Sequence, residues 1–417
     1  MLLLCQQQPG FAYSVLTHQQ IIDLAWDTSI RPLLLSRYPS TTEAELRRAQ
    51  AFAYGGCAIQ DAGYYPFGHR FMSDLTHYVR TGDFVAALIR DARNVNELAF
   101  ALGALSHYVG DSYGHQDAVN PSTAIEFPNL AAKYGPVVTY DESPHSHVRT
   151  EFAFDINQLS KRRFAPSAYL QHIGLNVSTR LMEQAFAETY GLQLRSMVVN
   201  RRAAVDSYRS SVRRFLPSIA YAEALLHKNS FPDDFPSADF DRFQQRLADA
   251  DFKHGWEQYR RKAGIRTHLL AFVIVILPKI GPLSDLAIRG PNQQTEEKYV
   301  ISVNRTLDRY EQLLGELTQN PALSPELALT LENRDLDTGY QAKPGTYPLT
   351  DQTYAKLLDR LVEHNRPIST HLKQNIEGYY ADSTAPITTK KNKKAWQRVQ
   401  ANLITLRDMP ETQMAQQ

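Results

Sequence analysis

Cysteine is scarce in this 417-residue chain, which carries only Cys5 and Cys57. Small secreted scaffolds depend on several disulfides, so the composition excludes that class of protein. If the first twelve residues are removed during export, one cysteine remains and no intramolecular disulfide can form. An argument for export therefore rests on the N-terminal segment and not on cysteine content.

Net charge is also small, because 45 Lys and Arg residues face 44 Asp and Glu residues, which gives +1. Such a balance creates no long-range field that attracts nucleic acid or anionic lipid. The basic run "KKNKK" at 390–394 is interpreted as a solvated helix start, with a basic patch that touches a membrane as the alternative. Charge alone thus indicates no partner.

Long apolar runs are missing as well. The longest, "LLAFVIVIL" at 269–277, has nine residues, which is about half of what a membrane-spanning helix needs. We predict that this run is a buried helix or strand and that the mature chain has no transmembrane helix.

The N-terminal stretch "MLLLCQQQPGFAYS" combines a short apolar run with Gly10, Phe11 and Ala12. Small residues three and one before a cut are typical of a secretory signal peptide. We therefore expect residues 1–12 to be a signal peptide remnant, cleaved before Tyr13, and the protein to be secreted or periplasmic. A disordered N-terminus and a lipoprotein Cys5 are the alternatives.

Strict period-two alternation is scarce, whereas helical spacing recurs along the chain, so we predict an all-α protein. Pro, Asp and Ser are frequent at 227–243, and we interpret this segment as a linker. The resulting division is a first domain over 13–225 and a helical C-terminal region of unknown role over 226–417. We expect the second part to pack on the first and to border its functional cleft.

The stretch "HYVGDSYGHQDA" at 107–118 places His107, Asp111 and His115 at intervals of four. In an α-helix this spacing puts all three side chains on one face. His147 and Glu151 repeat the interval in "HVRTE". Imidazole and carboxylate together are a ligand set for zinc, and carboxylates also bridge two ions. A single pair is often only a satisfied polar contact, but the whole set favours a metal site. Further upstream candidates are His18, Asp61 and His77.

The motifs "HYVGDSYGH", "HVRTE", "QDAGYYP" and "LTHY" resemble the zinc-dependent phospholipase C family, which shares its α-helical fold with the single-strand-specific zinc nucleases. The resemblance covers about residues 13–200. It implies a multi-helix bundle around a cleft that holds three zinc ions, and the helical spacing beyond residue 225 adds a helical C-terminal extension to this bundle.

The resemblance also implies which residues bind each ion. Tyr13 would bind through the amine and carbonyl oxygen that signal cleavage leaves at the chain start, and Asp111 would bridge two ions. His69 and His145 are competing candidates for the roles of His77 and His147, with exposed loop histidines as the alternative. The implied ligands are Asp61, His77, His107 and Asp111 for the first zinc, His115, His147 and Glu151 for the second, and His18 and Tyr13 for the third.

The expected chemistry is in-line attack of zinc-activated water on a phosphodiester, with Asp61 orienting the water or acting as base. Tyr64, Tyr65 and Phe67 follow Asp61 and either line the cleft or belong to the core. A phospholipid is the expected substrate, with transient membrane-surface contact. Because the chain has no basic track, nucleic acid is the less favoured substrate and a nuclease the first alternative. A catalytically idle metal-binding interaction protein is the second alternative.

Overall fold

The computed structural model describes residues 14–226, 232–260, 290–319, 331–382 and 384–412. Within these ranges helices form nearly all the regular structure, so the predicted all-α class is confirmed. None of the helices in the described ranges is long and apolar enough to cross a membrane. Tyr13, Cys5 and the apolar run 269–277 lie outside the described residues.

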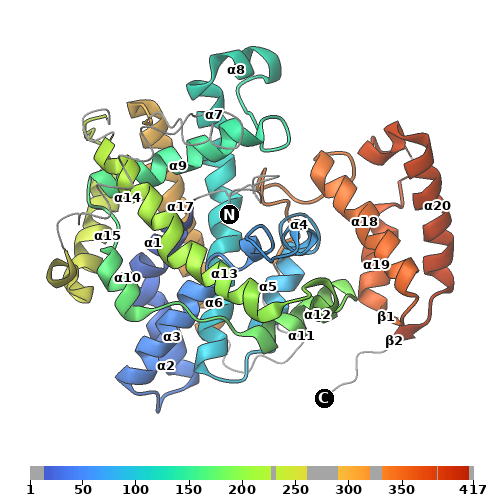
Figure 1. Ribbon diagram of the computed structural model, residues 1–417, viewed down its shortest axis with the longest axis horizontal. Helices are drawn as coiled ribbons and strands as arrows, with labels where there is room; N and C mark the ends of the chain where they lie inside the picture. The colour runs from blue at the N-terminus through green and yellow to red at the C-terminus, as the bar shows by residue number, and fades with distance from the viewer. Residues whose placement is uncertain (1–13, 227–231, 261–289, 320–330, 383, 413–417) are drawn as a thin grey trace.

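The first half of the chain is a succession of helices connected by short turns (Figure 1). Two of the segments are π-helical, η1 and η3, and one is a 3-10 helix, η2. The bounds are α1 Val15–Ala25, η1 Trp26–Ile30, α2 Arg31–Arg37, α3 Glu43–Gly56, η2 Gln60–Gly63, α4 Arg70–Tyr78, α5 Thr81–Arg90, α6 Val95–Tyr113, η3 Gly114–Val119, α7 Asn120–Glu126, α8 Pro128–Tyr134 and α9 Pro144–Ser160.

The remaining described helices continue from residue 167 to the C-terminal part. Two short strands, β1 and β2, pair in parallel near the end of the chain. The bounds are α10 Ser167–Ile173, α11 Thr179–Tyr190, α12 Leu194–Met197, α13 Arg201–Ser210, η4 Ser211–Phe215, α14 Leu216–Leu226, α15 Ala238–His254, η5 Trp256–Tyr259, α17 Gln293–Gln319, α18 Pro348–His364, β1 Ile368–Ser369, α19 Thr370–Tyr379, η8 Thr388–Lys391, α20 Lys393–Asp408 and β2 Glu411–Thr412.

Helices α3 and α6 approach each other unusually closely, because small residues meet at their contact. A Cβ atom added to Gly56 would lie 2.0 Å from the carbonyl oxygen of Phe100. One added to Gly103 would lie 2.2 Å from the carbonyl oxygen of Ala53. Since real Cβ contacts of this length do not occur, only glycine permits this backbone approach. The contact fixes the position of α6, which carries the central histidine motif.

Helix α17, from the second half of the chain, packs among helices of the first half. Its Tyr299 hydroxyl lies 3.0 Å from the hydroxyl of Thr17 on α1, and its Tyr310 hydroxyl donates to the carbonyl of Leu102 on α6 at 2.9 Å. Both tyrosines are fully buried. The expected packing of the C-terminal region on the first domain is therefore present, while the predicted boundary after residue 225 stays a prediction.

Helices α18, α19 and α20 form a separate group at the right of Figure 1, and α18 contacts α4. The basic run 390–394 covers the end of η8 and the first turn of α20, where the Asn392 side chain accepts a hydrogen bond from the backbone of Ala395 at 3.2 Å. The run is thus a capped, solvated helix start, as its first interpretation required.

The predicted linker at 227–243 is wrong in its second part, since α15 begins at Ala238. Ser237 caps this helix by accepting a hydrogen bond from the backbone of Phe240 at 3.1 Å, and Phe243 is fully buried. Asp and Ser at a helix start mimic a loop composition, which explains the error.

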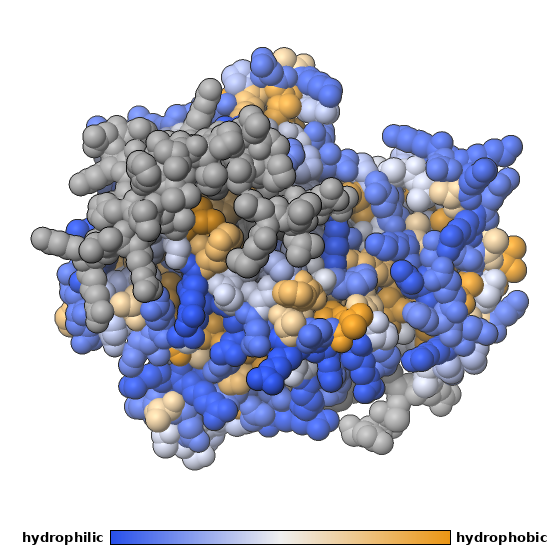
Figure 2. All heavy atoms as spheres, viewed as in Figure 1, coloured by the Kyte–Doolittle hydropathy of each residue, from blue (hydrophilic) through white to orange (hydrophobic). Residues whose placement is uncertain are grey.

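The face of the molecule in Figure 2 is mostly hydrophilic over its described part, and hydrophobic residues appear there in small separate groups. Scattered apolar side chains are normal on protein surfaces and identify no docking face. Membrane contact therefore stays a proposal.

Candidate metal centre

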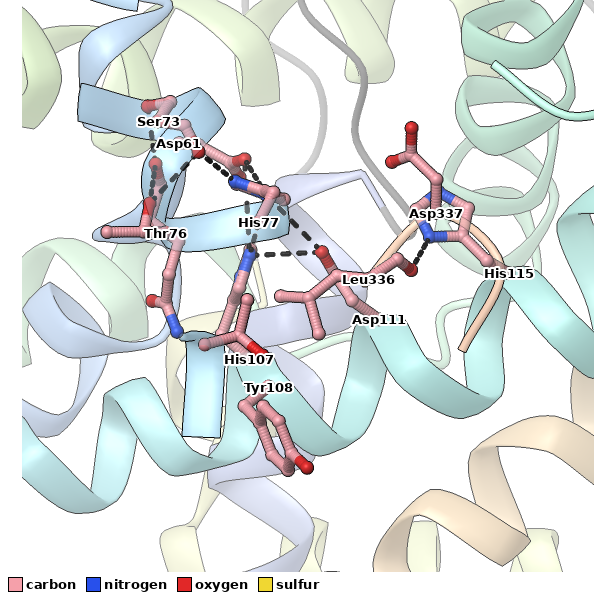
Figure 3. A network of polar contacts seen from close by, with 12 residues as sticks. Asp61, Ser73, Thr76, His77, His107, Tyr108, Asp111, His115, Leu336 and Asp337 are labelled. Atoms are coloured by element: carbon pink, nitrogen blue, oxygen red, sulfur yellow. Dashed lines mark hydrogen bonds and ion pairs between the residues drawn. The ribbon is translucent and has the colours of Figure 1, made fainter. Parts of the chain in front are cut away.

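The central motif begins as predicted on α6, but the helix changes geometry at its end. His107 and Asp111 lie one turn apart on α6, whereas a π-helical turn begins at Gly114, one residue before His115. The assumption of uniform α-helix through His115 is therefore wrong in the last turn. In Figure 3 the His115 ring lies away from the His107 and Asp111 side chains. Single π turns inside helices are frequent at functional sites.

Asp111 lies between two groups of imidazoles. One of its oxygens, Oδ1, is 3.2 Å from Nε2 of His18, which α1 supplies. The other, Oδ2, is 3.1 Å from Nε2 of His107 and 3.5 Å from Nε2 of His77. Oδ1 thus faces His18, whereas Oδ2 faces His77 and His107, as the predicted role of Asp111 as a bridge between two ions requires.

Asp61, from the 3-10 helix η2, faces the same side of the cluster as His77 (Figure 3). Its Oδ1 is 3.2 Å from Nε2 of His77 and 4.0 Å from Nε2 of His107. The two imidazole nitrogens are themselves 3.4 Å apart. Two ligands at about 2.0–2.1 Å from a tetrahedral zinc ion are about 3.3 Å from each other, so this spacing suits a shared cation.

A further group forms where α9 meets η3. Nδ1 of His147 lies 3.1 Å from Oε1 of Glu151, and Nε2 of His115 lies 3.6 Å from the same oxygen. The two rings are stacked with centroids 4.8 Å apart. The structure therefore contains three compact donor groups among its described residues. They are His18, His107 and Asp111; Asp61, His77 and His107; and His115, His147 and Glu151.

Hydrogen bonds on the outer side of the rings fix their tautomers. Nδ1 of His77 contacts the carbonyl of Ser73 at 2.7 Å, and Nδ1 of His107 contacts the carbonyl of Cys57 at 3.1 Å. A carbonyl oxygen only accepts, so each Nδ1 carries the hydrogen. In the neutral rings both Nε2 atoms then present lone pairs to each other and to Asp61. Metal-binding histidines show this pattern of outer hydrogen bonds to backbone carbonyls.

The residues of the three groups fit zinc. All eight side chains are at least 98% buried. Within the described ranges no donor other than an imidazole nitrogen reaches the carboxylate oxygens of Asp61, Asp111 and Glu151. Buried carboxylates without donors are costly unless they are paired or bind a cation. Imidazole and carboxylate together are a common donor set of zinc sites.

Electrostatics around Glu151 also favours a bound cation. Burial raises the pKa of the Glu151 carboxyl well above its ordinary value, and the Asp111 and Asp61 carboxylates raise it further. Burial lowers the pKa of His147 well below its ordinary value, and neighbouring His115 lowers it further. The protein alone thus disfavours charge on this group, whereas a divalent cation would favour the ionised carboxylate beside neutral imidazoles.

The end of α1 that carries His18 is held by α9. The Asp155 carboxylate accepts hydrogen bonds from the backbone of Leu16 at 3.0 Å and of Thr17 at 3.1 Å, and from the Thr17 hydroxyl at 2.6 Å. Asp155 follows Glu151 by one turn on α9. Helix α9 therefore supplies two ligand candidates, His147 and Glu151, and positions a third, His18.

Comparison with known proteins agrees with this geometry. Residues 17–197 match the family model described as "Zinc dependent phospholipase C". This part of the chain belongs to the zinc-dependent phospholipase C family. Searches of curated proteins and of solved structures gave no match. All eight side chains of the three donor groups lie inside the matched range. The chain thus contains a phospholipase C-family domain whose donor groups support zinc binding and phosphodiesterase-like chemistry.

The competing histidines lie outside the three donor groups of this phospholipase C-family domain. His145 is exposed at the start of α9, and His69 is half-buried before α4. Neither contributes to a donor group within the described ranges. Tyr13 lies outside the described residues, so its role as a ligand stays a prediction.

The aromatic residues after Asp61 lie in different environments. Tyr65 is buried against Tyr208, with ring centroids 5.7 Å apart, and belongs to the core. Tyr64 lies beside His77, with centroids also 5.7 Å apart, and Phe67 is 65% exposed. Tyr64 therefore borders the donor group of His77.

Sequence reasoning missed residues that surround the His115–His147–Glu151 group. Leu336 accepts a hydrogen bond from His115 through its backbone carbonyl, and Asn120 accepts one from His147 through its side chain. Asp337 lies close to His115 (Figure 3). A backbone carbonyl leaves no trace in a motif, and Leu336 is separated from His115 by 221 positions, so no local spacing could have indicated this contact.

Proposed function

We propose that the chain is a zinc-dependent phosphoric diester hydrolase of the phospholipase C type, with three zinc ions in its centre. The observation that carries the proposal is the adjacency of three buried donor groups, two of which share His107. Asp111 faces both of these groups with separate oxygens. Clustered divalent sites of this kind suit phosphodiester chemistry, because the substrate carries negative charge on several oxygens.

The donor groups support the ligand assignment that the family resemblance implies. Asp61, His77, His107 and Asp111 would hold the first, His115, His147 and Glu151 the second, and His18, with Asp111 as bridge and Tyr13 as the expected further ligand, the third. When bound, the ions would lower the pKa of water toward neutrality and neutralise charge on the phosphoryl oxygens.

Asp61 is the proposed general base. Its Oδ1 faces His77 at 3.2 Å, whereas no hydrogen-bond donor in the described ranges reaches Oδ2. The second oxygen is therefore suited to orient a water molecule and accept its proton. Attack in line on phosphorus breaks the bond to the glycerol oxygen, which takes up a proton and leaves as a diacylglycerol. The headgroup leaves as a phosphomonoester.

Charge near the centre favours a phospholipid over a polynucleotide. The carboxylate of Asp337 lies in the surroundings of Tyr64, next to His77, whereas the nearby carboxylate of Asp74 is paired with Arg70. Additional negative charge beside the site opposes the binding of a polyanion, and the net charge of +1 provides no compensating field. A zwitterionic phospholipid headgroup does not carry this penalty.

The test is hydrolysis of phosphatidylcholine vesicles, compared with hydrolysis of single-stranded DNA by the same preparation. We expect release of phosphocholine that a chelator abolishes and added zinc restores. Asp61→Asn should remove the activity while most of the zinc remains. The matched control is Asp74→Asn, because Asp74 pairs with Arg70 and Tyr64 and belongs to none of the donor groups.

Each other outcome has a defined meaning. Hydrolysis of DNA alone would replace the phospholipase C assignment by the nuclease alternative. Full zinc content without hydrolysis of either diester would favour the catalytically idle alternative.

Export belongs to the same proposal. Ser14, the residue after Tyr13, is buried at the start of α1, four residues before His18. If export cleaves the chain after Ala12, a free amine at Tyr13 would directly precede this helix, and the protein would be secreted or periplasmic. N-terminal sequencing of the protein from its native source should begin at Tyr13. An intact Met1 would contradict the proposal.

A further inference from the structure

A hairpin over residues 332–342 lies outside the family-matched range and reaches the metal centre. Arg334 and Gln341 form its antiparallel bridge. The backbone of Ala342 donates to the carbonyl of Asn333 at 2.8 Å, and the backbone of Gly339 donates to the carbonyl of Asp335 at 3.0 Å. These bonds close a tight turn at Leu336, Asp337 and Thr338.

The hairpin is fastened to helices that carry ligand candidates. The backbone of Leu336 donates to the carbonyl of His77 at 2.9 Å. The Asp337 carboxylate accepts hydrogen bonds from the hydroxyls of Tyr78 at 2.9 Å and Tyr347 at 2.6 Å. On the other side Gly339 touches α6, since an added Cβ would lie 2.0 Å from the carbonyl oxygen of Ser112. The turn is thus held on three sides.

One hydrogen bond from this turn sets the state of His115. Nδ1 of His115 contacts the carbonyl of Leu336 at 2.5 Å, as the dashed line in Figure 3 shows. The carbonyl only accepts, so Nδ1 is the protonated nitrogen of the ring. Nε2 then presents its lone pair toward Glu151, 3.6 Å away.

A second connection runs through Asn120 to His147. The Asn120 amide nitrogen donates to the carbonyl of Asp337 at 2.8 Å, which leaves its Oδ1 to face Nε2 of His147 at 2.9 Å. Oδ1 only accepts, so Nε2 of His147 is the protonated nitrogen. Nδ1 then presents its lone pair to Glu151. One turn therefore orients both imidazoles of the group toward the same carboxylate.

We propose that the 332–342 hairpin is the outer shell of the His115–His147–Glu151 group, and that Leu336 and Asn120 are positioning residues that set the tautomers of both histidines for zinc binding. The inference rests on the proposed function insofar as it assumes a zinc ion at this group. It also gives part of the C-terminal region a role, which is to complete a metal site whose ligand candidates all come from the phospholipase C-family domain.

The test compares two glycine substitutions at equivalent turns. Gly339→Ala forces the turn away from Ser112, because the residue has φ +72 and the added Cβ would meet backbone. Gly345→Ala is the matched control, since Gly345 has φ +75 and its Cβ would meet the carbonyl oxygen of Pro386, at 2.5 Å, away from the donor groups. Zinc per chain is measured by elemental analysis over a series of buffered free zinc concentrations.

We expect Gly339→Ala to lower the affinity for one of the zinc ions by about 10–100-fold, the usual effect of losing hydrogen bonds to metal-binding residues. Gly345→Ala should bind zinc like the unaltered protein. Asn120→Ala should lower the affinity for the same zinc ion. Asn120→Asp, which keeps an acceptor for His147, should recover part of this affinity. The Asn120 pair decides the question if Gly339→Ala fails to fold.

The tautomers provide a readout that general destabilisation would not change. In the zinc-free protein, histidine nitrogen NMR should show hydrogen on Nδ1 of His115 and on Nε2 of His147, and Asn120→Ala should alter only the second. Unchanged zinc affinity in both Gly339→Ala and Asn120→Ala, or the opposite tautomers, would overturn the inference. Absence of zinc from the unaltered protein would instead overturn the proposed function.

Discussion

The close contact between α3 and α6 gives the sharpest stability prediction. In Gly103→Ala the new Cβ would lie 2.2 Å from the carbonyl oxygen of Ala53, whereas ordinary contacts begin at 3.4 Å. The atom it meets is backbone and cannot rotate away, so the two helices must move apart by about 1 Å, and overpacking of this kind costs about 1–3 kcal/mol.

Two smaller effects accompany the separation. The 3.1 Å contact between Nδ1 of His107 and the carbonyl of Cys57 would lengthen, and losing it costs about 1 kcal/mol. In the opposite direction, alanine has a higher helix propensity than glycine, which stabilises the folded protein by about 1 kcal/mol. The net expectation is a loss of about 1–3 kcal/mol of unfolding free energy.

Gly315→Ala is the matched control, because Gly315 also lies inside a helix, α17, but an added Cβ meets no atom within 4 Å. It should stabilise the protein by about 0.5–1 kcal/mol. Urea unfolding of the zinc-free protein, followed by circular dichroism, measures both variants. If Gly103→Ala proved as stable as Gly315→Ala, the close α3–α6 contact and the reasoning built on it would be refuted.

Three further predictions concern Asp155, Asp23 and the shared carboxylate. Asp155→Asn leaves one acceptor oxygen for the three donors at the start of α1, so thermal unfolding should show a loss of about 1–3 kcal/mol of unfolding free energy. An unchanged melting temperature would contradict a stabilising role of these hydrogen bonds. Burial raises the pKa of Asp23 from 3.8 to about 8, so between these pH values the folded protein retains a proton that the unfolded chain loses. The free energy of unfolding should therefore fall as pH rises through this range, by an amount on the order of 5 kcal/mol. Asp23→Asn should flatten this decline in unfolding measurements from pH 5 to pH 9, and a decline as steep as in the unaltered protein would assign it to other groups. Glu151→Gln should lower the zinc content by about one ion per chain. Asp111→Ala should lower it by about two, because Asp111 faces two donor groups. Equal losses in elemental analysis would contradict the sharing of Asp111 between two ions.

The ligand pairs could be predicted because their geometry is local. His107 with Asp111, and His147 with Glu151, are each four residues apart on one helix, and the structure keeps both pairs within 3.1 Å. The α-helix itself brings such residues together. The same reasoning failed one turn later, since no sequence rule indicates that the helix widens to a π turn before His115.

The outer shell could not be predicted from spacing. Asn120 and His147 are separated by 27 positions, and His115 and Leu336 by 221. These contacts depend on how the hairpin packs on α4 and α6, and one acceptor is a backbone carbonyl that every residue possesses. Tertiary packing, and not residue type, decides which carbonyl a histidine reaches.

The most direct test of the central claim is the number of zinc ions per chain, measured by elemental analysis on two forms of the protein. A chain that begins at Tyr13 should hold about three ions, and one that retains residues 1–12 about two, because its Tyr13 amine is part of a peptide bond. Three ions in both forms would keep the three donor groups as metal sites and exclude Tyr13 as a ligand. Zero or one ion in the form that begins at Tyr13 would contradict the metal centre.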